Sequence, residues 1–149
     1  MQKSSYKSKI SRVIKIVLNR EKKTTKSLEC HSLVNRLLES REDQRDFREF
    51  LENIGLPDHQ SYIEFIIRVR NLDKIESKTE LEIEIFEIYE RFLKPFATEK
   101  LQIDWATKAK IDTYMKNKPI SVHIFNDAAL ISTAKIHFAL LHFYNCHHD

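Results

Sequence analysis

The chain has 149 residues, the size of one domain with its own hydrophobic core. One glycine and three prolines are too few for the tight turns of an all-β fold, so we expect an all-α protein. Two cysteines, Cys30 and Cys146, exclude a secreted disulfide framework, and no apolar run approaches the roughly 18 residues of a membrane span. The N-terminal region also lacks the continuous apolar core of a secretory signal. These features predict a cytoplasmic protein with reduced cysteines.

Charge is distributed unevenly along the chain. Residues 1–28 contain nine Lys or Arg residues and a single acidic residue, Glu21. Because the formal net charge of the whole chain is +3, the other residues together carry −5. The sequence therefore predicts a basic N-terminal arm, residues 1–27, and a mildly acidic helical domain, residues 28–149.

The arm has the pattern of a basic amphipathic helix. Its apolar residues recur at helical spacing between basic ones: Ile10, Val13, Ile14, Val17 and Leu18. Such a helix binds anionic membrane surfaces, with about 1 kcal/mol for each basic residue near the lipid. The membrane contacts would then be Lys9, Arg12, Val13, Lys15, Ile16 and Val17. A helix that folds back on its own domain has the same pattern, and both interpretations stay open. Nucleic-acid binding is disfavoured, because the arm has few aromatic side chains to stack on bases.

Two helices are predicted at the start of the domain. Four leucines at helical spacing indicate the first: Leu28, Leu33, Leu37 and Leu38. Apolar residues at i, i+3, i+4 and i+7 indicate the second: Phe47, Phe50, Leu51 and Ile54. Ser40 and Asp43 have the spacing of a capping box before this second helix. Gly55 lies where the helix end needs left-handed backbone angles, and Pro57 follows it.

A third helix is predicted from a broad apolar run: Ile63, Phe65, Ile66, Ile67 and Val69. The start of this helix has two solutions. Ser61 and Glu64 have capping-box spacing, and Asp58 is an equally good cap one turn earlier.

Residues 80–93 carry two competing patterns. Leu81, Ile83 and Ile85 alternate with glutamates, as in a half-buried strand. The alternation ends at Phe86, and a helical stripe overlaps it: Ile85, Ile88, Tyr89 and Phe92. Because Glu and Leu favour helices and no glycine marks a partner hairpin, we predict one long helix that ends before Pro95.

A short exposed loop, residues 97–103, is predicted after this helix. Gln102 lies at its far end, where loops between rigid helices often carry recognition groups. Asp104 is expected to cap a helix that begins at Trp105. Further on, Ile120, Val122 and Ile124 alternate, which indicates an extended segment before a cap at residues 126–127. The last predicted helical face, with a possible break into two helices left open, consists of Ala128, Ile131, Ala134, Phe138 and Leu141.

Patterns for catalysis or metal binding are missing from the sequence. His137 and His142 are five residues apart, whereas zinc-binding pairs on a helix are separated by three or four. Neither a glycine-rich phosphate loop nor a nucleophile elbow occurs. We therefore expect no enzyme activity of its own, no cofactor and no metal site.

An ordered set of segments between about residues 28 and 146 carries a family likeness: Leu37-Leu38, Phe47-Arg-Glu-Phe-Leu51, Ile63-Glu-Phe65, Ile88-Tyr-Glu-Arg-Phe-Leu93, Ala97, Leu101-Gln-Ile-Asp104, Ile111 and Phe125-Asn-Asp-Ala128. In this order the chain resembles the regulator of G-protein signalling (RGS) domain. The resemblance implies an RGS-like bundle of about nine helices, here preceded by the basic amphipathic helix. We expect a monomer in the cytoplasm, peripheral at the plasma membrane if the arm binds lipid.

The resemblance also implies a function. An RGS domain binds the GTP-loaded α subunit (Gα) of a heterotrimeric G protein and accelerates its GTP hydrolysis by holding the Gα switch segments in their transition-state shape. The corresponding contact positions in this sequence are Ser61, Tyr62, Glu64, Gln102, Asp104 and His142.

These positions depart from the family pattern in three places. Gln102 stands for an asparagine and keeps the amide with one more methylene. Ser61 and Tyr62 stand for a Glu-Asn pair, and Tyr62 does not reproduce a short amide. The family's C-terminal Asp and Arg fall near Phe138 and His142, where neither charge is kept. The alternative is therefore an RGS-homology module that docks a partner or a membrane without activating a GTPase, and a basic nucleic-acid-binding domain is a third class.

Overall fold

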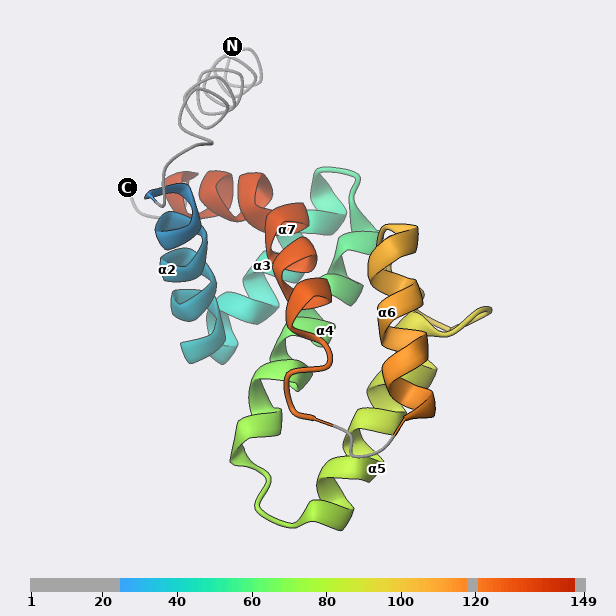
Figure 1. The fold of residues 1–149 in the computed structure, drawn as a ribbon. Helices are drawn as coiled ribbons and strands as arrows, with labels where there is room; N and C mark the ends of the chain where they lie inside the picture. The colour runs from blue at the N-terminus through green and yellow to red at the C-terminus, as the bar shows by residue number, and fades with distance from the viewer. Residues whose placement is uncertain (1–24, 118–120, 147–149) are drawn as a thin grey trace. The chain divides into compact units, whose positions relative to one another are not determined.

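The structure, a computed structural model, describes residues 25–117 and 121–146. Within these ranges it contains six α-helices, three short helical segments and no strand (Figure 1). The α-helices are α2 (Thr25–Glu39), α3 (Arg41–Asn53), α4 (Gln60–Asn71), α5 (Lys78–Ile88), α6 (Trp105–Lys116) and α7 (Asn126–Cys146). The short segments are the 3-10 helices η1 (Pro57–His59) and η2 (Leu72–Lys74) and the π-helix η3 (Tyr89–Leu93). The all-α prediction is confirmed for this part of the chain.

Several predictions concern residues outside these ranges. The predicted amphipathic helix and its membrane contacts belong to residues 1–24, and Ile120 belongs to residues 118–120. The expected number of helices refers to the whole chain. These statements stay predictions.

Contacts within the chain group it into two compact units, unit 1 (Met1–Phe50 and His137–Asp149) and unit 2 (Leu51–Ile136). The buried apolar residues of unit 1 come from α2, α3 and the end of α7: Val34, Leu37, Phe47, Leu140, Phe143 and Tyr144. The centroid of the Phe143 ring lies 5.3 Å from that of Phe47 and 5.6 Å from that of Phe50. Aromatic packing between α3 and α7 therefore stabilises unit 1.

Ser40 caps α3, as the sequence predicts. Its Oγ accepts a hydrogen bond of 3.1 Å from the backbone N–H of Asp43. The Asp43 carboxylate does not complete the capping box, because it accepts a hydrogen bond of 2.8 Å from the hydroxyl of Tyr144. Burial, followed by this bond, raises the pKa of Tyr144 well above its ordinary value.

The end of α3 also follows the prediction at Gly55, which has φ of 82°. The N–H of Gly55 donates to the carbonyl of Glu52, and that of Leu56 donates to the carbonyl of Leu51. These two bonds satisfy the last carbonyls of the helix and require a left-handed residue between them. The predicted stripe is wrong at its last position, because the helix ends at Asn53 and Ile54 is 44% exposed.

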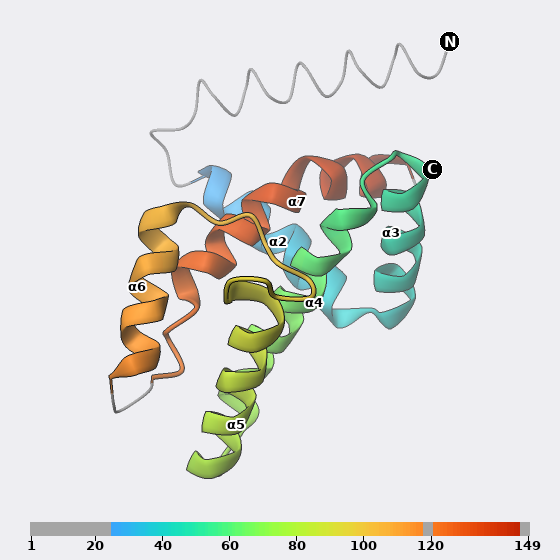
Figure 2. The same cartoon turned by 90° about the vertical axis from the view of Figure 1, so that its right-hand side faces the viewer.

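Unit 2 is organised around Phe65 on α4. Its ring meets those of Phe92 and Phe125 edge-on, with centroids 5.5 and 5.9 Å away. Buried aliphatic residues from α4 and from several other elements of this unit surround these rings: Ile63, Ile66, Leu72, Ile85, Ile88, Leu93, Leu101 and Ile111. Figure 2 shows α4, α5 and α6, the elements that supply most of these side chains.

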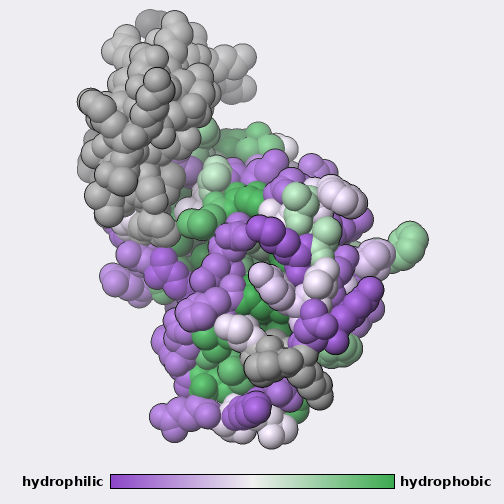
Figure 3. Space-filling view, in the orientation of Figure 1, coloured by the Kyte–Doolittle hydropathy of each residue, from purple (hydrophilic) through white to green (hydrophobic). Residues whose placement is uncertain are grey.

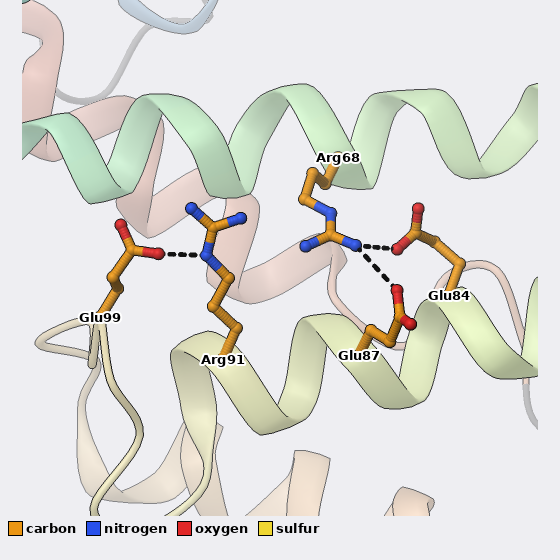
Figure 4. Close-up of polar contacts among 5 residues, drawn as sticks. All are labelled: Arg68, Glu84, Glu87, Arg91 and Glu99. Atoms are coloured by element: carbon orange, nitrogen blue, oxygen red, sulfur yellow. Dashed lines mark hydrogen bonds and ion pairs between the residues drawn. The ribbon is translucent and has the colours of Figure 1, made fainter.

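Helices α4 and α5 run side by side in opposite directions (Figure 4). Arg68 on α4 reaches across to two carboxylates of α5, pairing with Glu84 and, at 3.2 Å, with Glu87. One turn beyond, the guanidinium of Arg91 pairs with Glu99 (Figure 4). The ion pairs of Arg68 thus link α4 to α5, and the Arg91–Glu99 pair links η3 to the segment that follows it.

The helical prediction for residues 80–93 is confirmed, since α5 continues directly into η3. The last turn widens into a π-helix, with the N–H of Lys94 donating to the carbonyl of Tyr89 at 3.0 Å. The Tyr89 hydroxyl donates to Asp112 of α6 at 2.7 Å. Burial, followed by this bond, raises the pKa of Tyr89 to about 12.

The predicted starts of α4 are both wrong. The helix begins at Gln60, its N-cap is His59, and no side chain accepts a hydrogen bond there. Asp58 lies inside the 3-10 turn η1, and Ser61 lies within the first turn of α4. Because η1 runs directly into α4, the N–H of Gln60 finds the carbonyls of Pro57 and Asp58, and no side-chain cap is needed.

Two predictions before and along α7 are also wrong. Residues 122–125 form turns instead of an extended segment, with the N–H of Ile124 donating to the carbonyl of Ser121. Helix α7 is continuous, and its buried positions are mostly four residues apart: Ala128, Ser132, Ile136, Leu140 and Phe143. The predicted face fails at Ala134, which is exposed. Polar Ser132 is buried instead, because its hydroxyl donates to the carbonyl of Ala128 at 2.8 Å.

Candidate functional site

The segment between η3 and α6, residues 94–104, is called the connector; it is yellow in Figure 1 and projects beside α6. Its backbone is tied down at several points. The N–H of Glu99 donates to the carbonyl of Arg91 at 3.0 Å, and that of Leu101 donates to the carbonyl of Phe92 at 2.9 Å. Leu101 is buried, so the far half of the connector is anchored in the core of unit 2.

Tyr62 on α4 holds the next residue of the connector. Its ring is buried, and its hydroxyl accepts a hydrogen bond of 3.2 Å from the backbone N–H of Gln102. The side chain of Gln102 is exposed. The connector therefore exposes the Gln102 amide to solvent, while the Tyr62 hydroxyl holds the backbone of the same residue.

Asp104 closes the connector and caps α6, as the sequence predicts. One carboxylate oxygen accepts from the N–H of Thr107 at 2.9 Å, and the other accepts from the Thr107 hydroxyl at 2.8 Å. These bonds lower the pKa of Asp104, so its charge is maintained beside Gln102.

The first turns of α4 lie against this segment. Tyr62 is the residue in direct contact with the connector, and its ring meets the ring of His59 edge-on at 5.5 Å. Burial, followed by the charge of Lys135, lowers the pKa of His59. The hydrogen bond that Arg91 donates to Glu99 raises the pKa of Arg91, and the nearby carboxylate of Glu64 adds to this effect.

The six predicted contact residues thus divide between the units. Ser61, Tyr62 and Glu64 on α4 and Gln102 and Asp104 at the end of the connector all belong to unit 2. His142 belongs to unit 1, where its ring lies 5.9 Å from that of Phe50. Tyr62 differs from the others in burial, with only 6% of its surface exposed.

Two large aromatic side chains were not predicted as site residues. Phe96 is 98% exposed and Trp105 is 83% exposed, and they lie on either side of Gln102 in the sequence. Phe96 also has φ of 64°, a left-handed conformation that costs a non-glycine residue about 1–2 kcal/mol. The sequence held a signal for Trp105, because six residues of helix place it about 120° away from the buried Ile111.

The charges around these aromatics are mixed but include lysines on the connector and on α6. Burial, followed by the side-chain hydrogen bond with Lys100 and then by the charge of Lys100, lowers the pKa of Lys108. On the face drawn in Figure 3, hydrophilic residues are interspersed with hydrophobic patches. The candidate site itself combines the exposed Gln102 and Asp104 with two exposed aromatic side chains, Phe96 and Trp105.

Within residues 25–117 and 121–146, no group of three or more His, Cys, Asp or Glu side chains is placed to hold a metal ion. No helix in the same part of the chain is both long and apolar enough to span a bilayer.

Residues 33–136 match the family described as the Regulator of G protein signaling domain. No curated protein matches the chain. The matched segment includes all of unit 2 and therefore the whole connector with its supports. It also extends over more than half of the sequence. The chain belongs to the regulator of G-protein signalling domain family.

Proposed function

We propose that this RGS domain binds a GTP-loaded Gα subunit through the connector and the start of α4, and accelerates GTP hydrolysis by that subunit. The observation that carries the proposal is the exposed amide of Gln102 on a backbone that Tyr62 fixes from beneath. A loop backbone that is held in place before binding loses little conformational entropy when it meets a partner.

In this mechanism the domain positions the switch segments of Gα and supplies no acid or base. The Gln102 amide offers both a donor and an acceptor to a Gα switch segment, and Asp104 adds an ionised carboxylate next to it. Contacts that are stronger in the transition-state shape of the switches than in their ground state lower the barrier to hydrolysis. The water and the GTP stay in the active site of Gα.

Phe96 and Trp105 are proposed as apolar anchors of the same interface. Exposed tryptophan is enriched among the residues that dominate binding energy at protein interfaces. Covering both side chains with a partner removes their apolar surface from water, which is favourable. Neither side chain is part of the core of the domain. A partner that contacts Gln102 would meet them at the borders of the same surface.

The test is single-turnover GTP hydrolysis by a panel of Gα subunits, with the wild type and with Gln102→Ala. Removing the amide leaves a partner group unpaired at the interface, at a cost of about 1–3 kcal/mol. At about 1.4 kcal/mol per tenfold change, the activation should fall by roughly 5- to 150-fold. The matched control is Asn71→Ala, an exposed amide at the other end of α4, which should leave activation unchanged.

Binding to Gα in its GDP, GTP-analogue and aluminium-fluoride states gives the complementary measurement. Preference for the aluminium-fluoride state would identify recognition of the transition state. If no Gα in the panel is activated, the activating function is rejected.

The buried ring of Tyr62 favours the second candidate function, an RGS-homology module that docks a partner without activating it. In place of a short exposed amide, this position has a side chain that supports its own domain. Equal binding to the GDP and aluminium-fluoride states, with no acceleration of hydrolysis, would identify this docking function.

A further inference from the structure

A chain of contacts links His59 to the connector. His59 is the N-cap of α4, and its ring meets the ring of Tyr62 edge-on, with the two centroids 5.5 Å apart. The hydroxyl of Tyr62 in turn accepts the hydrogen bond of 3.2 Å from the backbone N–H of Gln102. All three residues belong to unit 2. His59 therefore packs against the side chain that holds the backbone of the proposed Gα-binding amide.

The surroundings of His59 disfavour its protonated form. Burial has the largest effect and lowers the pKa of His59 below the ordinary 6.5, and the charge of Lys135 on α7 lowers it further. The charge of Asp58 in η1 opposes these two effects. The position of His59 at the start of α4 is also unfavourable for a cation, because the N-terminal end of a helix dipole is positive. The packed ring is therefore neutral at pH 7.

Protonation favours a different arrangement of this ring. A histidine that turns away from Tyr62 into solvent regains the hydration of its charge. Because this exposed arrangement binds a proton more tightly than the packed one, a fall in pH shifts the population toward it. Each unit of difference between the two pKa values makes the shift about tenfold. The ring of Tyr62 then loses a packing partner, and its hydroxyl holds the connector less firmly.

We propose that protonation of His59 releases the connector, so that this RGS domain binds and activates Gα less well in acid than at neutral pH. The proposal rests on the Gα-binding function proposed above and adds the proton as a regulator of the same site. Its direction follows from the contacts of His59. The connector is held when the ring is neutral, above about pH 6.5, and is progressively released as the pH falls below this value.

Hydrogen exchange of the Gln102 amide, followed by NMR in the full chain without Gα, tests the release directly. Between pH 7.5 and 5.5 the protection factor of this amide should fall by at least about threefold, the ratio that half a unit of difference in pKa produces. The amide of Ile111, a buried residue of α6, should keep its protection. That comparison separates release of the connector from unfolding of unit 2.

Three variants assign the effect to His59. In His59→Gln, which stays neutral, the protection of Gln102 should not depend on pH. In Lys135→Gln, at an exposed position, the fall should be smaller, because one cause of the difference in pKa is removed. His123→Gln changes an exposed histidine of the same unit and should behave as the wild type. Constant protection in the wild type, or an equal fall in His59→Gln, would overturn the proposal.

Single-turnover GTP hydrolysis by Gα at pH 7.5 and 6.0 measures the functional consequence, with hydrolysis by Gα alone subtracted at each pH. Activation by the wild type and by His123→Gln should fall more than activation by His59→Gln. Equal falls in all three proteins would overturn regulation by His59. Absence of activation at both pH values would reject the proposed function instead, whereas release of the connector is decided by the exchange of the Gln102 amide, which needs no Gα.

Discussion

Tyr62 combines two roles at the residue scale, because its ring fills the core of unit 2 and its hydroxyl holds the backbone of the connector. In Tyr62→Phe the ring is retained and the N–H of Gln102 loses its acceptor. We expect the free energy of unfolding to fall by about 1–2 kcal/mol. Urea denaturation measures this loss, and Tyr114→Phe, which changes an exposed tyrosine on α6, is the matched control.

The same substitution tests whether the Tyr62 hydroxyl only holds the connector or also contacts Gα directly. If the hydroxyl acts only by fixing the connector, Tyr62→Phe should weaken Gα activation less than Gln102→Ala does, because the amide is still present. A larger loss in Tyr62→Phe than in Gln102→Ala would assign the hydroxyl itself to the interface.

His59 gives unit 2 a dependence on pH. Burial, followed by the charge of Lys135, lowers its pKa below the ordinary 6.5, although the charge of Asp58 opposes the shift. The unfolded chain therefore binds this proton at a higher pH than the folded chain does, so stability falls as the pH drops below about 6.5. In His59→Gln the part of the decline that begins near this pH should be smaller. Thermal melts at pH 7.5 and 5.5 compare the two proteins, and identical declines would show that His59 does not contribute.

At the scale of elements, the proposed Gα-binding surface includes the connector and the first turn of α6. Trp105 is the first residue of α6 and is 83% exposed, so Trp105→Ala removes no buried contact and should leave the melting temperature unchanged. As an interface anchor it should nevertheless cost about 2 kcal/mol or more of Gα binding, roughly 30-fold in Kd. Tyr114→Ala, an exposed aromatic on the same helix, is the control and should bind normally. Unchanged affinity in both variants would remove Trp105 from the interface.

The helix ends and the buried helix faces show which parts of the fold could be predicted from the sequence. The Asp104 cap, the end of α3 at Gly55 and the helix through residues 80–93 could be predicted, since each depends on local spacing and backbone preference. The start of α4 could not, because the carbonyls of η1 replace the expected side-chain cap. The buried face of α7 was misread because an apolar pattern omits Ser132, whose hydroxyl is satisfied within its own helix.

The candidate site divides in a similar way. Gln102 could be placed at the end of an exposed loop from the sequence, and the structure agrees on its exposure. The burial of Tyr62 could not be predicted, because it depends on the connector folding back over α4, a contact between residues forty positions apart. The exposure of Phe96 follows from a left-handed turn that no glycine marks.

At the scale of the whole molecule, Phe96 places stability and recognition in opposition. Its ring is 98% exposed and its backbone is held at φ of 64°, so the fold gains almost nothing from the side chain and bears the strain of its conformation. Asparagine adopts this conformation more readily. Phe96→Asn should therefore melt at the same temperature as the wild type or a few degrees higher, while Gα activation falls as the apolar anchor is lost. Calorimetry and single-turnover hydrolysis on the same preparation measure the two effects, and a destabilised variant with full activity would contradict both.

A chain selected for stability alone would not retain this phenylalanine. Laboratory selection for thermal resistance without a Gα assay should therefore replace Phe96 early, and selection under both pressures should keep it. The residue found at position 96 after directed evolution would therefore show whether stability or Gα recognition determines the sequence of the connector.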